Sequence, residues 1–352
     1  MKIFTCHLPY DRRIVIKMIK NALNSKLKFT QIPTIDLTPW KVGDYTSEID
    51  RLIERALDDY GFMNLVGHEI RGSIVRSLIC ELKEYFDRPF EQKTLDTVKP
   101  DNYRGYIPLG FFSPNNGSGE SDNYEGFKLH FEISNSHPVC DECALYGPNR
   151  WPANSRNLRQ LIMDYWADCD RLTTQLLAAF ERILGLKTGT LQSLFDFPLT
   201  NMTLLHYPAS EKSIGIHPHI DTDVLTLLPP GLGKDVQIRP ANETKWMSVG
   251  DTKDSIIANV GKMMEIWSGG RFISTPHKVS ISPGCSRYSF PYFVVPRHDV
   301  LIRPLLKSTK KELFESISAG ELSRQIWTSN WANASSVDSE FDPFVEEAMN
   351  DC

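Results

Sequence analysis

The chain has 352 residues, a formal net charge of −5 and 41% hydrophobic residues. This length suffices for one large domain or two ordinary ones, and the composition is that of a globular protein with a hydrophobic core. The mildly acidic balance argues against a nucleic-acid-binding face. No apolar run approaches the roughly 18 residues of a membrane-spanning helix. The cysteines are scattered and odd in number, which favours a reducing compartment, so a cytoplasmic location is expected.

The first third of the chain alternates helical and strand-like patterns. Residues 1–30 are basic and predict an amphipathic helical extension in preference to a transit peptide. A short strand is predicted at 32–37, a helix at 47–62 followed by the strand-like FMNLVGH, and a second helix at 73–89 that Pro89 ends.

Residues 96–152 are rich in Gly, Pro, Asn and Ser and predict a long irregular segment, which in a compact domain is usually functional. Within it, Cys140 and Cys143 form a CxxC. No second pair stands at zinc-site spacing, which favours a loop with two thiols over a metal or redox site.

The strongest helical pattern runs from Leu158 to Leu184 and ends at Gly185. Beyond about residue 199 the hydrophobic period changes from 3.6 to 2, and many short strand candidates follow, which indicates a sandwich or closed barrel. The candidates are NMTLLHYP, VLTLLP, DVQIRP, KWMSV, SIIANVG, MEIWSGG, ISTPHKVSI and RYSFPYFVVP. The tail (308–350) returns to a helical pattern with Trp327 and Trp331.

Residues 217–228, HPHIDTDVLTLL, place two histidines and two aspartates just before an apolar strand. Residues i and i+2 of a strand share a face, so His219 and Asp221 are expected side by side, with His277 of a later strand as a third ligand. Two histidines and one carboxylate leave three coordination positions open, as in non-heme Fe(II) oxygenases. His217 and Asp223 are the alternatives within the same stretch.

Arg287 and Ser289 follow ten residues after His277 and are again i and i+2. A guanidinium and a hydroxyl on one face suit a carboxylate, which a planar fork binds through two parallel hydrogen bonds. A surface arginine beside a strand serine is the alternative. Together with the metal ligands, the pair favours a site for a dicarboxylic 2-oxoacid.

These residues together resemble the catalytic core of the isopenicillin N synthase-like family of iron(II)/2-oxoglutarate-dependent oxygenases. The similar stretches in the core are HIDTDVLTLL, VQIRP…KWMSV, IIANVGKMMEIWSGGRFISTPHKV and RYSFPYFVVP. Upstream, IPTIDL, DYGFMNLVGHEI, YRGYIPLG, EGFKLHFEIS and GPNRWP resemble the N-terminal region of that family in the same order. The resemblance covers most of residues 32–300.

The resemblance implies a ligand set. His219, Asp221 and His277 would hold Fe(II), and Arg287 and Ser289 would bind the distal carboxylate of 2-oxoglutarate. Tyr207, in LLHYP, matches a family tyrosine that often reaches this cosubstrate. His206 stands where the family frequently has an asparagine. Lys262 follows Gly261 where the family usually has Gly-Asp. Both departures concern the surroundings of the site, not its ligands.

The implied fold is mainly β with flanking helices: a double-stranded β-helix (jelly-roll, cupin-like) core with a long supporting helix. The expected organisation is a basic helical extension at 1–30, an N-terminal α/β region at 31–152, the long helix and catalytic core at 153–300, and a helical tail at 301–352.

The implied activity is oxidation of an unactivated C–H bond of a small molecule in specialised metabolism, with O2 and 2-oxoglutarate as cosubstrates. Hydroxylation, oxidative cyclisation and desaturation are alternative outcomes. A monomer is expected, without nucleic-acid or membrane partners. The substrate site is expected to draw on the C-terminal helix and on Tyr103, Arg104, Phe127, Lys128 and His130. If two or more of the cations Arg104, Lys128, Arg239 and Lys262 face the iron, an acidic substrate is favoured.

The sequence alone is also compatible with two other functions. One is an iron oxidase that uses no 2-oxoglutarate, in which Arg287 and Ser289 bind the carboxylate of the substrate itself. The other is a non-catalytic, metal-free or zinc-loaded binding module on the same barrel.

Overall fold

The computed structural model describes residues 31–43, 45, 47–99, 102–112, 121–153, 155–232, 235–241, 243–250, 253–306 and 316–329. The chain divides into a unit of residues 1–31 and a unit of residues 32–352, and only the second is described below. The predicted basic helix at 1–30 and Trp331 lie outside the described residues. Among the described helices, none is both long and apolar enough to cross a membrane.

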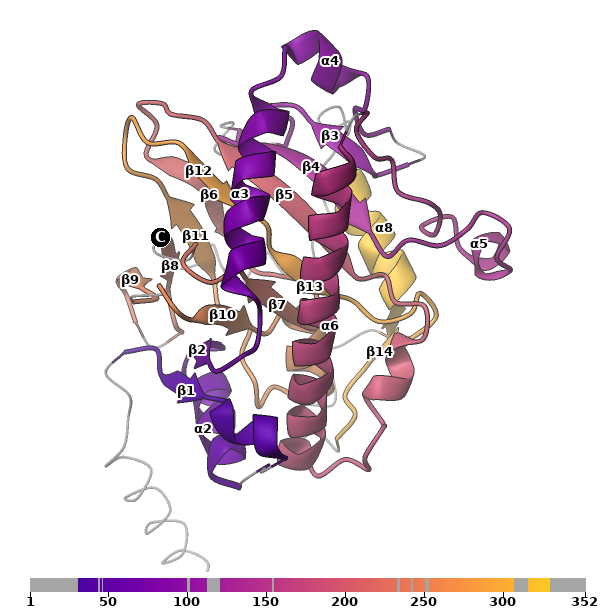
Figure 1. Cartoon of the computed structure of the whole chain (residues 1–352). Helices are drawn as coiled ribbons and strands as arrows, with labels where there is room; N and C mark the ends of the chain where they lie inside the picture. Colours follow the sequence, from indigo (N-terminus) through magenta and orange to yellow (C-terminus); the bar gives the residue numbers. More distant parts are fainter. Residues whose placement is uncertain are drawn as a thin grey trace, which may run out of the picture. The chain divides into compact units, whose positions relative to one another are not determined.

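Two β-sheets form the core of the second unit (Figure 1). The order in the larger sheet is β1-β2-β10-β7-β13-β5-β4-β3, with β12 also paired to β5, and the order in the smaller sheet is β6-β11-β8-β9. Apart from the parallel pair β1–β2, the described strands of both sheets pair antiparallel.

The strands have the following bounds. The larger sheet contains β1 (Thr34–Asp36), β2 (Phe62–Val66), β3 (Gly105–Ile107), β4 (Glu125–His130), β5 (Asn201–Tyr207), β7 (Leu225–Leu228), β10 (Ile256–Asn259), β12 (Arg287–Ser289) and β13 (Tyr292–Val294). The smaller sheet contains β6 (Ile214–His219), β8 (Val236–Ile238), β9 (Met247–Ser248) and β11 (His277–Ser280). A separate pair is formed by β14 (Leu301–Ile302) and β15 (Ile317–Ser318).

One face of the larger sheet is covered by helices. Helices α3 (Gly72–Phe86) and α6 (Arg156–Leu184) run side by side across it (Figure 1). Helix α6 ends where the sequence predicts, because Gly185 adopts a left-handed φ of 67° that favours glycine. The remaining helices are η1 (Thr38–Val42), α2 (Ser47–Asp59), α4 (Phe90–Thr94), α5 (Val139–Glu142), η2 (Gln192–Phe195), α7 (Lys262–Trp267) and α8 (Ala319–Ser329).

Strand alternation separates this helix-covered outer face from an inner face. Leu225 and Leu227 of β7 belong to the main hydrophobic core together with Leu172 and Leu176 of α6, so they point outward. Thr226, between them, therefore points inward. Residues that pair directly across strands share a face, and the register carries this inner face across the sheet. It contains Thr226, Phe293, Asn201, Asn259, Thr203, Lys128, His130, Tyr207, Arg287 and Ser289.

The predicted irregular segment at 96–152 is partly wrong. It contains β3, α5 and the fully buried strand β4, which lies between β3 and β5. The apolar residues of β4 are Phe127 and Leu129, which face outward, whereas the inner positions are Gly126, Lys128 and His130. The strand is buried on both sides yet polar on one, so its sequence lacks an apolar run.

The predicted strand MEIWSGG is also wrong, because its first residues belong to α7. Met263, Met264, Ile266 and Trp267 are all buried, and a short run that is apolar on every side does not distinguish a helix from a strand. Helix α7 supports the site directly. The backbone N–H groups of Lys262 and Met263 donate hydrogen bonds to the carbonyl oxygens of Asp221 and Asp223, at 2.8 and 3.1 Å.

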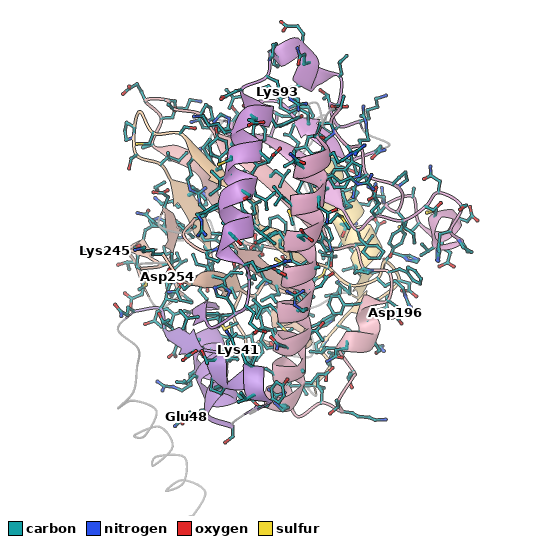
Figure 2. The ribbon with its side chains drawn as sticks, viewed as in Figure 1. Lys41, Glu48, Lys93, Asp196, Lys245 and Asp254 are labelled. Carbon is teal, nitrogen blue, oxygen red and sulfur yellow. The ribbon has the colours of Figure 1, made fainter. Side chains whose placement is uncertain are left out.

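A buried polar network on the outer face joins β4 to its neighbours. Glu125 accepts hydrogen bonds from Lys93 Nζ at 2.7 Å, Tyr106 Oη at 2.5 Å and His206 Nδ1 at 2.8 Å. His206 Nε2 contacts Ser286 Oγ at 3.0 Å, next to Arg287. Lys93 is labelled in Figure 2 near the end of α3 that leads to α4.

Replacing Glu125 with alanine is expected to lower the free energy of unfolding by about 3–5 kcal/mol, because Lys93 would become a buried cation without its partner. Urea denaturation measures this change. Glu125→Gln is the matched control: it keeps the side-chain volume and an acceptor and is expected to cost less. A loss below about 1 kcal/mol for the alanine variant, the range of an exposed ion pair, would contradict this interpretation.

Candidate metal centre

Three of the predicted ligands meet at the ends of two paired strands. His219 is the last residue of β6 and His277 the first of β11, and the two pair directly across the smaller sheet. Their ring centroids are 4.2 Å apart. Asp221 Oδ1 lies 3.7 Å from His219 Nε2 and 3.6 Å from His277 Nε2. The sequence prediction that these three residues come together therefore agrees with the geometry.

The local reason differs from the predicted one. Asp221 does not share a strand with His219, since β6 ends at His219 and Asp221 lies in the connection to β7. The connection is fixed by α7 from one side. Gly261, before α7, is required there because an added Cβ would lie 2.3 Å from Asp223 Oδ1.

The ligand atoms are oriented by hydrogen bonds on their far sides. His219 Nδ1 donates to the carbonyl of His217 at 2.8 Å, and His277 Nδ1 donates to that of Thr275 at 3.1 Å. Both rings therefore present an Nε2 lone pair to the centre, as the second hydrogen bond of metal-ligating histidines does.

Asp221 is held in the same manner. Its Oδ2 accepts hydrogen bonds from Thr226 Oγ1 at 2.6 Å and Asn259 Nδ2 at 2.8 Å. This leaves Oδ1 toward the two imidazoles. Neither Thr226 nor Asn259 was predicted from the sequence, although an asparagine inside the apolar SIIANVG is a signal that could have identified Asn259.

The electrostatics suit a divalent cation. Burial alone would raise the pKa of Asp221, but the adjacent His277 and His219 and the two hydrogen bonds to Oδ2 bring its pKa below the usual value. Burial, together with the proximity of His219, lowers the pKa of His277 to about 4. At neutral pH the centre thus offers a carboxylate and a neutral imidazole, the forms in which these groups bind metals.

The two alternatives in the same stretch lie elsewhere. Among the described residues, the group whose ligand atoms lie within 4.8 Å of one another is His219, Asp221 and His277, without His217 or Asp223. His217 donates from both its backbone N–H and its Nδ1 to Asp122 Oδ1, at 3.0 and 2.8 Å. Burial and the charge of Asp221 raise the pKa of Asp223 well above its usual value, which disfavours the carboxylate form.

The predicted carboxylate clamp lies on the inner face. Arg287 and Ser289 are at the two ends of β12, opposite Tyr207 and Leu205 of β5. Arg287 is fixed by Asp235, 3.1 Å from its Nε, and by the carbonyl of Leu232, 2.5 Å from its Nη2. Neither Asp235 nor Leu232 was identified from the sequence.

Two donors of this clamp have no partner among the residues that the structure describes. These are Arg287 Nη1 and Ser289 Oγ, both fully buried. Leaving buried donors unpaired is costly, so they are expected to bind a ligand group. The guanidinium carbon of Arg287 also lies 4.8 Å from the ring centroid of Tyr207. Burial raises the pKa of Tyr207 to about 12, against the opposing effect of Arg287, so the phenol stays protonated.

The four predicted cations divide into two pairs. Lys128 lies on the inner face, and Arg104 is buried beside β3, 3% exposed. The guanidinium carbon of Arg239 lies 5.3 Å from the ring centroid of Trp246. Lys262 Nζ forms an ion pair with Glu265 Oε2 at 3.4 Å. The thiols of Cys140 and Cys143 are unpaired, and Cys140 Sγ donates to the Ser134 carbonyl at 3.4 Å.

Comparison with known proteins places this geometry in a family. Residues 32–154 match the model of the N-terminal region of the non-haem dioxygenase in morphine synthesis, and residues 199–296 match that of the 2OG-Fe(II) oxygenase superfamily. The chain is 30% identical over 297 residues to the 2-oxoglutarate-dependent dioxygenase tropC of Talaromyces stipitatus, covering 78% of this chain and 89% of that relative. The chain belongs to the iron(II)/2-oxoglutarate-dependent dioxygenases.

Further comparisons agree with this assignment of the dioxygenase. It is 27% identical over 302 residues to the 2-oxoglutarate-dependent dioxygenase 11 of Oryza sativa subsp. japonica, with 84% of this chain and 81% of the relative covered. Full-length Neurospora crassa T7H, solved with alpha-KG and thymine, superposes with a TM-score of 0.73 at 22% identity, covering 85% of this chain and 97% of that one. The predicted double-stranded β-helix is confirmed, as are Fe(II), 2-oxoglutarate and O2 as requirements of the dioxygenase.

Proposed function

We propose that the dioxygenase binds Fe(II) through His219 Nε2, Asp221 Oδ1 and His277 Nε2, and that Arg287 and Ser289 bind the distal carboxylate of 2-oxoglutarate. The observation that supports this most directly is the pair of buried, unpartnered donors Arg287 Nη1 and Ser289 Oγ on the inner face. They match the two oxygens of a carboxylate, and charge-assisted hydrogen bonds of this type are each worth about 1.5–3 kcal/mol.

The donor set fits ferrous iron. Two imidazoles and one carboxylate from one side are the ligands of non-heme Fe(II) oxygenases, and they leave positions open for a chelating cosubstrate. Bound iron supplies the activation of O2 that the oxidation of an unreactive C–H bond requires.

The residues of the chain perform the rest. The carbonyls of His217 and Thr275 orient the two imidazoles, and Thr226 and Asn259 orient the carboxylate. Asp235 holds the guanidinium of Arg287 so that Nη1 stays available on the inner face. The ring of Phe62 packs edge-on against the ring of His277, with their centroids 5.3 Å apart. This contact reduces the access of water to that side of the centre.

The reaction proposed is oxidation of a C–H bond of a small molecule, by hydroxylation, oxidative cyclisation or desaturation, in specialised metabolism. Structures of the same fold contain thymine (N. crassa T7H) and JA (JOX2) as small-molecule partners. An acidic substrate and action as a monomer are part of the proposal. The acidic character is supported by the inner-face position of the buried Lys128.

The decisive experiment is an anaerobic titration of the Fe(II)-loaded enzyme with 2-oxoglutarate. A visible metal-to-ligand absorption band is expected, and admission of O2 should produce succinate. Absence of both band and succinate would contradict the assignment of the clamp. It would instead favour an oxidase in which Arg287 and Ser289 bind the carboxylate of the organic substrate.

A further inference from the structure

Two buried cations, Lys128 and Arg104, form no ion pair with a carboxylate among the described residues. Lys128 is 9% exposed, and its Nζ donates to Asn201 Oδ1 at 2.6 Å and Thr203 Oγ1 at 2.9 Å, both neutral acceptors. Arg104 donates from Nη2 to the carbonyl of Leu145 at 2.7 Å, and its buried Nε has no partner among the described residues. The other buried cations do have carboxylate partners, namely Lys93 with Glu125, Lys262 with Glu265 and Arg287 with Asp235.

A charge in this position is expensive unless something compensates it. Burial lowers the pKa of Lys128 to about 7 and that of Arg104 to about 10. Asp223, the acidic group that acts on Lys128 electrostatically, lies beyond ion-pair distance and does not pair with the ammonium. Burial removes the water that would stabilise the ammonium of Lys128. An anionic ligand beside it would replace that stabilisation.

His130, two residues further along β4, does not supply this charge. Burial and the nearby Arg104 and Lys128 lower its pKa well below the usual value, so the ring is neutral. Its Nε2 donates to the carbonyl of Tyr103 at 3.0 Å. Lys128 is therefore the inner-face group of β4 that can carry a positive charge toward a ligand.

Aromatic rings connect this region with the clamp. Trp327 of α8 stacks on Tyr103, with centroids 4.9 Å apart and planes inclined by 20°. From Tyr103 the line continues through Phe112 and Tyr124 to Tyr207. The centroids of successive rings are 6.0, 6.5 and 6.1 Å apart. Such a line of rings favours a flat, unsaturated ligand, which can offset-stack or meet the rings edge-on.

We propose that Lys128 selects the substrate: its ammonium binds an acidic oxygen of a flat, unsaturated small molecule, whose apolar part packs against the rings of Tyr103, Phe112, Tyr124 and Trp327. This inference rests on the proposed function and specifies the substrate class of that site.

The test compares acids with their neutral amides. Benzoate, trans-cinnamate and 1-naphthoate, each beside its primary amide, are titrated anaerobically into enzyme loaded with Fe(II) and saturating 2-oxoglutarate, which keeps the Arg287 clamp filled. Binding is read from tryptophan fluorescence and from the shift of the iron absorption band. At least one acid should bind about tenfold or more tightly than its amide, as one charge-assisted hydrogen bond predicts. If no acid binds more tightly than its amide, the inference is overturned.

Variants assign the preference to Lys128. Lys128→Met should remove the preference for acid over amide, and Lys128→Arg should retain most of it. Lys278→Met is the matched control, since Lys278 lies on β11 with its Nζ over Trp246 at 4.7 Å, and it should change nothing. Trp327→Ala should weaken the binding of acid and amide alike. A Lys128→Met enzyme that melts normally and keeps the full preference would overturn the assignment.

The inference and the proposed function can fail separately. Succinate formation is measured on the same preparations, and its absence in wild type contradicts the proposed function alone. The fluorescence titration repeated on metal-free Arg287→Ala protein, in which the clamp cannot bind the test acids, still decides whether acids are preferred, including when Lys128→Met does not fold.

Discussion

Asp221→Ala should abolish retention of iron at this site, and 2-oxoglutarate-dependent turnover with it. Oδ1 is the atom shared by both short contacts to the imidazoles, so its loss leaves only two of the three ligands. Loss of a group that merely orients a ligand already costs about 10–100-fold in metal affinity, and loss of a ligand should cost at least about 100-fold. Iron per protein after desalting and the absorption band with 2-oxoglutarate measure the effect.

Asp223→Asn is the matched control for this variant. Asp223 lies in the same connection, is as deeply buried, and also contacts Thr226 Oγ1, at 2.8 Å. Because its pKa is raised well above the usual value, the neutral amide closely replaces its protonated form. The control should keep most of the iron. If it lost iron while Asp221→Ala kept it, the ligand set would be wrong.

Arg287→Ala should raise the 2-oxoglutarate concentration that gives half-maximal succinate formation by about 10–150-fold, the equivalent of one strong charge-assisted hydrogen bond. Turnover at saturating 2-oxoglutarate should fall much less, because the guanidinium is proposed to bind the end of the cosubstrate away from the iron. Ser289→Ala, which removes a neutral donor, should have a smaller effect in the same direction. Steady-state kinetics in 2-oxoglutarate and in organic substrate separate these effects.

Arg239→Ala is the control here, since Arg239 lies over Trp246 and is not part of the clamp. It should leave the 2-oxoglutarate dependence unchanged. Arg287→Ala could instead weaken the binding of the organic substrate and leave the dependence on 2-oxoglutarate unchanged. The clamp would then bind the carboxylate of the substrate. Thermal melting of each variant is the control for folding, because Arg287→Ala leaves Asp235 without its ion-pair partner.

The candidate site could be predicted from the sequence because its residues are polar side chains at positions where strands are otherwise apolar. His219, His277, Arg287 and Ser289 all stand in or at the end of β-strands of the barrel. Asp221 was found by its spacing from His219, although the strand expected to carry both ends between them. The connection is instead shaped by hydrogen bonds from α7, which neighbouring residues in the sequence do not reveal.

The errors share a physical cause. β4 is buried on both faces and five of the six residues of α7 are buried, so in neither element does the pattern of polar residues report exposure to solvent. Asp235, which orients Arg287, lies in a connection between β7 and β8 whose position depends on the tertiary structure. The divisions expected at residues 31, 153 and 301 stay predictions.

The two faces of β4 carry separable tasks, and this has a consequence for how such an enzyme can change. Glu125, at an odd-numbered position, joins the strand to Lys93, Tyr106 and His206 on the outer face, whereas Lys128, at an even-numbered position, lies on the inner face. A library that randomises residues 128 and 130 would therefore vary the inner face alone, whereas Gly126 is kept because an added Cβ there would lie 3.2 Å from the carbonyl oxygen of Leu204. Because of the same alternation, a substitution at an inner-face position of this strand changes the lining of the barrel without removing any member of the Glu125 network on the outer face.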